Sequence, residues 1–158
     1  MSLSPLHALL LLAALVIDVT ADRLAAADKP PTSRDPRLVI ELFSADPDIV
    51  TPTGLDVDHL GRVFAIESNT HFPPEGYDRH PTDRLLVLRD RDGDGRAEKP
   101  TVFADGFVHA MSVAVRTSFE PGQPDTVLVA TRKEVMALWD DDGDLVADRR
   151  RRILHLDT

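Results

Sequence analysis

A short acidic loop from Asp90 to Glu98 places carboxylates at loop positions 1, 3, 5 and 9, with glycine at position 6. Loops with this spacing of oxygen ligands bind hard cations such as calcium. The sequence therefore predicts a calcium site made by Asp90, Asp92, Asp94 and Glu98, with the backbone carbonyl of Arg96 as a further ligand. The alternative is an acidic turn in which the aspartates accept hydrogen bonds from nearby backbone amides.

The same pattern recurs fifty residues later, and it predicts a second metal site made by Asp140, Asp142, Asp144 and Asp148. Here Leu145 occupies position 6, where a positive φ costs a branched side chain about 1 kcal/mol or more. We therefore expect the second loop to be the weaker site. Neither loop carries glutamate at position 12, so neither is a true EF-hand.

A repeat of about fifty residues surrounds these loops and indicates a modular β architecture. In each copy a hairpin (54–67; 112–131) is followed by a strand, an acidic loop and another strand (84–103; 135–154). No sustained helical periodicity occurs after residue 38, and residues 38–43 are predicted as one more strand. Four short antiparallel strands form one blade of a β-propeller. The predicted fold is all-β, a partial propeller of about two four-stranded blades plus part of a neighbour.

Composition narrows the possible functions. The 158-residue chain has a net charge of −9, which argues against a surface that binds nucleic acid. It has no cysteine, so disulfides, thiolate metal sites, cysteine nucleophiles and covalent haem attachment are excluded within this chain.

The N-terminal residues resemble an export signal. Residues 8–17 form an unbroken apolar run that is too short for a stable membrane span, and Ala25 and Ala27 fit a cleavage site. We predict a signal-peptide helix at 1–27, a linker at 28–37 and a truncated N-terminal part of a propeller at 38–158. The protein is then exported to the periplasm or the extracellular space. The alternatives are an uncleaved anchoring helix and a misassigned start codon.

A long polar loop from Asn69 to Pro81 has no periodicity and separates two predicted strands. Long ordered loops on β scaffolds often carry function. His71 in this loop and Glu67 just before it are weak catalytic candidates, because an imidazole can act as a base near neutral pH. The alternative is that His71 only fixes the loop. His109 is predicted to be a structural histidine.

Several segments carry a family resemblance, above all Thr70 to Tyr77, whose sequence is THFPPEGY. With residues 54–67, 82–88 and 102–106 and the first acidic loop, it resembles the N-terminal propeller of a bacterial family of PVC-type membrane-bound dehydrogenases. Full-length members often end in a haem c domain with a CxxCH motif. The resemblance spans roughly residues 38–158, and it extends to quinoprotein sugar dehydrogenases of the sorbosone or soluble glucose dehydrogenase type.

The resemblance implies oxidation of a sugar or alcohol, with electrons passed to pyrroloquinoline quinone or to haem c. The CxxCH motif is absent here, so a haem would belong to another domain. The implied partners are the remaining propeller blades or a haem c domain of a longer chain, with carbohydrate as the implied ligand. The fragment alone is expected to be inactive, because such a site needs groups from several blades. The alternatives are a calcium-stabilised adhesion module that recognises glycans or proteins, and a gene fragment with no independent role.

Overall fold

The computed structural model describes residues 31–73 and 75–157. The chain divides into two compact units, Met1–Glu41 and Leu42–Thr158. The predicted signal helix and its cleavage site lie outside the described residues. Within the described ranges, no helix is long and apolar enough to cross a membrane.

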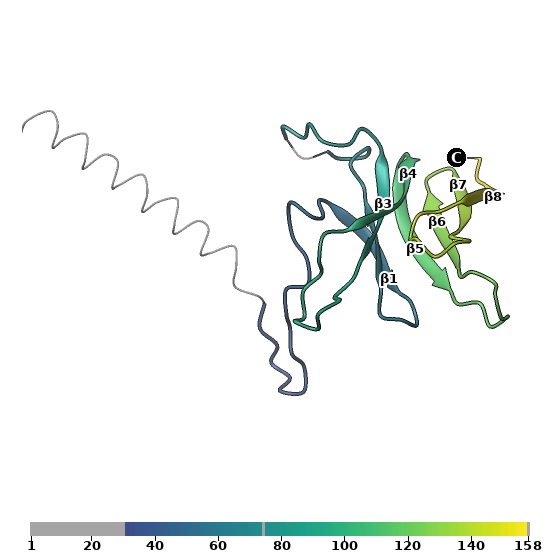
Figure 1. The fold of residues 1–158 in the computed structure, drawn as a ribbon. Coiled ribbons are helices and arrows are strands. Elements are labelled where there is room, and N and C mark those ends of the chain that lie inside the picture. Colours follow the sequence, from purple (N-terminus) through teal and green to yellow (C-terminus); the bar gives the residue numbers. More distant parts are fainter. Residues whose placement is uncertain (1–30, 74, 158) are drawn as a thin grey trace, which may run out of the picture. The chain divides into compact units, whose positions relative to one another are not determined.

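The second unit consists of two four-stranded antiparallel sheets that lie side by side (Figure 1). In each sheet the strands follow one another in sequence order, which is the meander of a propeller blade. The first sheet contains β1 (Pro52–Val57), β2 (Val63–Glu67), β3 (Asp83–Leu88) and β4 (Thr101–Phe107). The second contains β5 (Ala110–Arg116), β6 (Thr126–Thr131), β7 (Glu134–Trp139) and β8 (Arg149–His155). These sheets confirm the predicted all-β fold with two consecutive blades.

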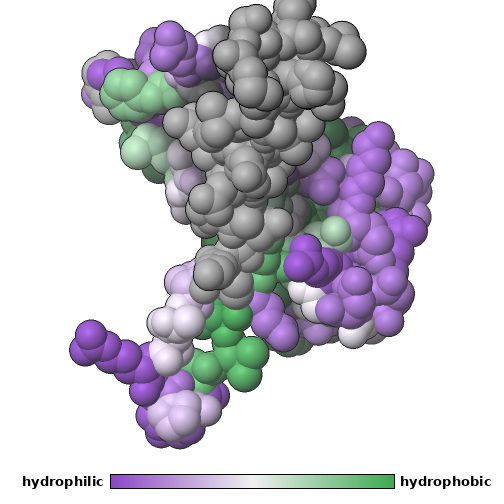
Figure 2. Space-filling model, turned by 90° about the vertical axis from the view of Figure 1, so that its left-hand side faces the viewer, coloured by the Kyte–Doolittle hydropathy of each residue, from purple (hydrophilic) through white to green (hydrophobic). Residues whose placement is uncertain are grey.

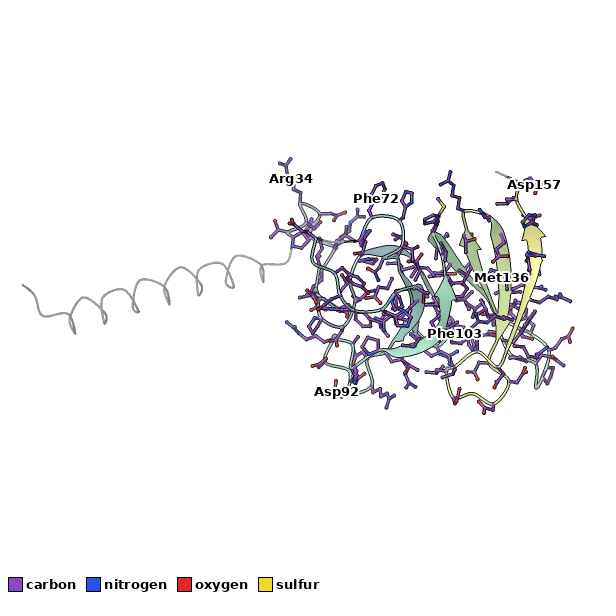
Figure 3. All side chains as sticks on the ribbon, turned by 90° about the horizontal axis from the view of Figure 1, so that it is seen from above. Arg34, Phe72, Asp92, Phe103, Met136 and Asp157 are labelled. Atoms are coloured by element: carbon purple, nitrogen blue, oxygen red, sulfur yellow. The ribbon has the colours of Figure 1, made fainter. Side chains whose placement is uncertain are left out.

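The core lies between the two sheets because side chains alternate across each strand. From the first sheet it receives Phe64, Ile66, Leu85, Val87 and Phe103, and from the second Val113, Val127, Val129 and Leu138. The rings of Phe64 and Phe103 meet edge to face, with centroids 5.3 Å apart. Figure 3 shows Phe103 between the sheets. The other face of the first sheet buries a smaller cluster with Phe43 and Ile49.

The first strands of the two sheets, β1 and β5, run close together. A Cβ atom on Gly54 would lie 3.0 Å from the Cα of Ser112, so glycine allows the two backbones to approach. The carboxylate of Asp56 accepts a 2.7 Å hydrogen bond from the amide of Val115 across the same gap. This close approach of first strands is the arrangement expected around the axis of a propeller.

Each acidic loop docks on the element that precedes its own sheet. The amide of Ala147 donates to the carbonyl of Phe103 on β4, and the amide of Ala97 donates to the carbonyl of Phe43, both at 2.8 Å. The carbonyl of Phe43 therefore makes the same contact with the acidic loop of the first sheet as the carbonyl of Phe103 makes with that of the second.

The predicted strand at 38–43 is wrong, because these residues have no strand assignment. A strand needs a neighbour to pair its backbone groups, and no described segment provides one here. Leu38, Val39, Ile40 and Leu42 are consequently exposed, with Val39 at 81%, whereas Phe43 packs against the first sheet.

In Figure 2, hydrophilic side chains cover most of the coloured surface, and apolar residues form local patches. This agrees with the acidic composition of the chain.

Candidate functional site

Because consecutive strands are antiparallel, the loops that connect them lie alternately at two opposite ends of the sheets. The β2–β3 loop, the β4–β5 corner and the β6–β7 hairpin lie at one end, which we call the pocket end. The two acidic loops follow β3 and β7 and lie at the other end. In Figure 3, Phe72 of the β2–β3 loop and Asp92 of the first acidic loop lie on opposite sides of the first sheet.

A pocket of about 470 Å³ opens at the pocket end, and its walls are mostly apolar. All three connections contribute to it, so both blades form its walls. The lining residues are Thr51, Thr53, Ser68, His71, Phe72, His109, Ala110, Met111 and Arg132.

Two histidines from different connections meet at this pocket. The ring centroids of His71 and His109 are 5.1 Å apart, with an angle of 79° between the rings. His109 has φ of +54°, and Thr51 on the same wall has φ of +51°, which is a rare conformation for both residue types. Strained backbone persists only where its surroundings hold it, and it is common at ligand sites.

The carboxylate of Asp83 holds this strained end together. Asp83 is fully buried and accepts hydrogen bonds from the amides of Asn69 (2.7 Å), Thr70 (2.8 Å) and Ala110 (2.7 Å). It also accepts from the hydroxyls of Ser68 (3.2 Å) and Thr70 (2.9 Å). The base of the β2–β3 loop and the start of β5 are thus tied to one side chain.

A relay through Thr70 extends this tie to His109. The Thr70 hydroxyl, which donates to Asp83, accepts a 2.7 Å hydrogen bond from the amide of His109. The carbonyl of His109 accepts from the amide of Arg132 at 3.1 Å, so the β6–β7 hairpin is included. Burial alone would raise the pKa of Asp83, but the amides of Ala110, Thr70 and Asn69 and the Thr70 hydroxyl lower it, and the net pKa lies below its ordinary value.

A second hollow of about 420 Å³ shares His109 and Arg132 with the pocket and adds Lys133 and Arg150. Its one acidic lining residue, Glu134, faces an arginine of β8 at 3.6 Å. Arg150 is held in place by a 3.0 Å hydrogen bond to a carbonyl of β4. This corner of an acidic protein therefore carries positive charge.

The structure does not bring the two catalytic candidates together. Glu67 is fully buried, where its carboxylate accepts from Arg84 (Nε, 2.7 Å) and from the amide of Val50 (3.1 Å). Glu67 is therefore one half of an ion pair with Arg84 and does not line the pocket. His71 does line the pocket, next to the ring of Phe72 at 4.2 Å between centroids.

The two acidic loops have nearly identical conformations. In the first, Asp90 accepts from the amides of Gly93 (2.7 Å) and Gly95 (2.9 Å). In the second, Asp140 accepts from Gly143 (2.7 Å) and Leu145 (2.9 Å). The amide of Gly95 lowers the pKa of Asp90 most strongly.

Position 6 has the predicted positive φ in both loops, +86° at Gly95 and +70° at Leu145. Leu145 is only 3% exposed and packs into the core between the sheets. Burial of a leucine stabilises by roughly 1.5–3 kcal/mol, which offsets the backbone cost that the sequence predicted.

In each loop three carboxylates can offer one oxygen each within 4.8 Å of one another. These triads are Asp90, Asp92 and Glu98, and Asp140, Asp142 and Asp148. The other predicted ligands, Asp94 and Asp144, lie outside the triads and accept backbone amides at 2.8 Å. The Oε2 atom of Glu98 is buried without a hydrogen-bond partner among the described residues.

A sequence model of the family described as "Domain of unknown function (DUF7133)" matches residues 33–155. The chain belongs to this family. A search of curated proteins found no match to this DUF7133 chain.

Among solved structures, the DUF7133 chain is similar to the holo form of the pyranose dehydrogenase PQQ domain from Coprinopsis cinerea. The two share 14% identity with a TM-score of 0.50, over 70% of this chain and 22% of that one. The calcium and iodide structures of family AA12 carbohydrate-active enzymes from Trichoderma reesei match at 17% and 16% identity, covering 74% and 73% of this chain and 25% of each enzyme. Both have a TM-score of 0.47.

The chain thus spans about a quarter or less of these structures. The likeness to the PQQ domain supports the expected resemblance to sugar dehydrogenases at the level of fold. Membership of the PVC-type group stays a prediction.

Several residues of the pocket end could not be identified from the sequence. Asp83, Met111 and Arg132 gave no local signal, because their partners are distant in sequence or are backbone atoms. The nearest hint for Asp83 was an acidic residue at the start of an otherwise apolar strand.

We expect Asp83→Asn to lower the free energy of unfolding by about 2–4 kcal/mol, because an amide NH2 would face backbone donors in a buried place. The folded pKa of Asp83 is depressed, so its contribution is present at neutral pH and is lost as pH falls below the ordinary aspartate value near 3.8. The difference between wild type and variant should therefore shrink in acid. Chemical denaturation at several pH values measures this.

Asp78→Asn is the matched control, because Asp78 is exposed. Equal stability of wild type and Asp83→Asn at pH 7 would contradict the role assigned to Asp83.

Proposed function

We propose that this chain forms one sector of an exported propeller dehydrogenase that oxidises a sugar or alcohol. The observation that carries this proposal is the pocket that both blades build at one end of the sheets, with His71, His109 and Arg132 on its walls. The fold likeness to a pyranose dehydrogenase PQQ domain supports it. The rest of the site, and the remaining blades, would come from residues outside this chain.

A quinone with carboxylate substituents, such as pyrroloquinoline quinone, fits the chemistry of this end. Arg132 and Lys133 have no carboxylate partner among the described residues, so they are available to hold carboxylates. The ring of Phe72 and the apolar pocket wall suit a planar ring system. When bound, such a quinone would supply the electron-accepting chemistry.

The chain's own residues would position the substrate and move its proton. His71 lines the pocket, and its role would be to accept the proton of the substrate hydroxyl, which is chemistry that imidazole side chains perform. His109, held by Thr70 and Arg132, would fix the substrate's orientation. A haem c domain, if present, would be a partner, since no covalent haem motif occurs in this chain.

The complete protein with all its blades, supplied with quinone and calcium, should reduce an artificial electron acceptor when given sugars or alcohols. His71→Ala should lower kcat/KM by about 10²-fold or more, the usual contribution of a general base. His155→Ala serves as the control, because His155 lies on β8 beside Asp157. The isolated chain should be inactive.

Two results would contradict this function. One is full activity in His71→Ala with the control unchanged. The other is specific binding of glycans by a chain that never shows quinone-dependent oxidation, which would favour a calcium-stabilised adhesion module.

We also propose that calcium occupies the acidic loops, first of all the loop that contains Glu98. The buried Oε2 of Glu98 without a partner supports this, because a buried unpaired carboxylate oxygen is costly unless something binds it. Each carboxylate oxygen has two acceptor sites, so the backbone hydrogen bonds to Asp90 leave capacity for a cation. The ion would stiffen a loop that docks on its neighbour through Ala97.

Calcium at 100 times its Kd should stabilise the folded chain by about 2.7 kcal/mol. Glu98→Gln should remove more of this gain than Asp148→Asn, and Glu120→Gln, a change in an exposed turn, should remove none. Differential scanning calorimetry with and without calcium measures the shift in Tm. A Tm that calcium leaves unchanged would contradict the proposal.

A further inference from the structure

The two sheets are built alike, so equivalent residues can be matched by position. Asp90 and Asp140 begin the two acidic loops, which make the same hydrogen bonds. Equivalent residues in this part of the two sheets are therefore fifty positions apart. Phe103 and Ile153 are such a pair, and each is the extra residue at a register shift in the last strand of its sheet.

One face of the first sheet is covered by the second sheet. That covered face carries Phe64, Ile66, Leu85, Val87 and Phe103. The equivalent face of the second sheet is also apolar, because side chains that pair across neighbouring strands share a face. We call it the outer face, and it consists of Leu128, Ala130, Val135 and Ala137, which pair across β6 and β7, with Ile153 of β8.

The outer face has no cover within the described part of the chain. It points away from Val127, Val129 and Leu138, which pack against the first sheet. Phe103 is 2% exposed, whereas its equivalent Ile153 is 48% exposed. None of the outer-face residues belongs to a buried cluster. Exposed apolar surface that is contiguous and not scattered marks an interaction site.

The backbone at this face has the same acceptor as the backbone of the covered face. The carbonyl of Phe103 accepts a 2.8 Å hydrogen bond from the amide of Ala147, which lies in the acidic loop of the next sheet. Among residues 31–73 and 75–157, no loop amide donates to the equivalent carbonyl of Ile153. A further acidic loop would supply the missing donor.

Charge narrows what can cover the outer face. Arg149 and Arg151 stand over the ring of Trp139, at 5.0 Å and 5.7 Å from its centroid. At the contact between the two existing sheets the first also supplies the cation, because Arg62 lies 4.0 Å from Asp125 of the second. The arginines beside the outer face therefore favour an acidic partner.

We propose that the outer face is a docking surface for a third sheet of the same kind. Counted from Asp90 or Asp140 as position 1, Ala97 and Ala147 stand at position 8 of their loops. The partner sheet has an apolar inner face and an acidic loop whose position-8 amide donates to the carbonyl of Ile153. The proposed function leaves the remaining blades unassigned, and this inference names the surface that receives the next one. It rests on the repeat of the blades and not on the proposed oxidation.

The test adds a second copy of residues 109–158 directly after Thr158. The added sheet then follows β8 with the same spacing as the second sheet follows β4. Its loop carries the required alanine, and its inner face is the one that already packs against the first sheet. Amide hydrogen exchange is measured on the original and on the extended chain.

In the extended chain, the amide of the added copy of Ala147 should exchange as slowly as Ala147 itself. Ile153→Asp in the original second sheet should speed that exchange by roughly tenfold or more, because it places a charge in the new contact. Leu60→Asp is the matched control, because Leu60 is exposed in a turn of the first sheet, and it should have no effect. In the original chain Ile153→Asp should leave the stability unchanged.

Fast exchange throughout the added copy would overturn the proposal. So would equal effects of Ile153→Asp and Leu60→Asp on the extended chain, or a loss of stability in the original chain with Ile153→Asp. Light scattering that shows the original chain to be a dimer, which Ile153→Asp dissociates, would overturn the choice of occupant in favour of a second copy.

Discussion

The Asp83 carboxylate is the interaction on which the pocket end depends. It accepts hydrogen bonds from three amides and two hydroxyls, which belong to the β2–β3 loop and to the first residue of β5. A buried carboxylate without such partners would be strongly unfavourable, so the loop and the second blade must adopt positions that satisfy it. The strained conformation of His109 follows, because Thr70 connects it to this carboxylate.

The opposite end is organised by repetition of a loop. Two loops that differ at position 6 keep the same hydrogen bonds, and each places an alanine amide against a phenylalanine carbonyl of the preceding element. In the second loop the side chain of Leu145 packs into the core between the sheets. This burial offsets the cost of a positive φ, which glycine in the first loop adopts without strain. The acidic loops therefore have a role in joining blades as well as in the proposed binding of calcium.

Short unbroken apolar runs predicted the strands that form blade interiors. The predicted strands at 84–88 and 135–138 lie within β3 and β7. Side chains on both faces of β3 are buried, whereas β7 is buried at Ala137 and Leu138 and half-buried elsewhere. The outer strands were harder to predict. β4 continues to Phe107 through a register shift, past an Asp-Gly pair that resembles a turn. β8 contains four consecutive arginines, which its exposed position at the edge of the second sheet tolerates.

The candidate site was predicted only in part. The acidic loops are local in sequence, so their ligands could be named from spacing alone. The pocket is made by residues that lie as far apart in sequence as Thr51 and Arg132, and its central contact joins Asp83 to Ala110. Such a contact follows from how two blades pack, which a single sequence does not show. Leu38 to Phe43 has the pattern of a strand, but no described segment pairs with it and it forms none. Strand formation therefore depends on backbone pairing with a neighbour as well as on the sequence pattern.

Amide hydrogen exchange most directly tests the central claim that the two sheets fold as one unit of consecutive blades. The amides of Ala110, Val115 and Ala147 bond across from one blade to the other. The account predicts that they exchange as slowly as amides inside β3 and β6, through global unfolding. Fast exchange at these three amides, with slow exchange inside each sheet, would contradict it.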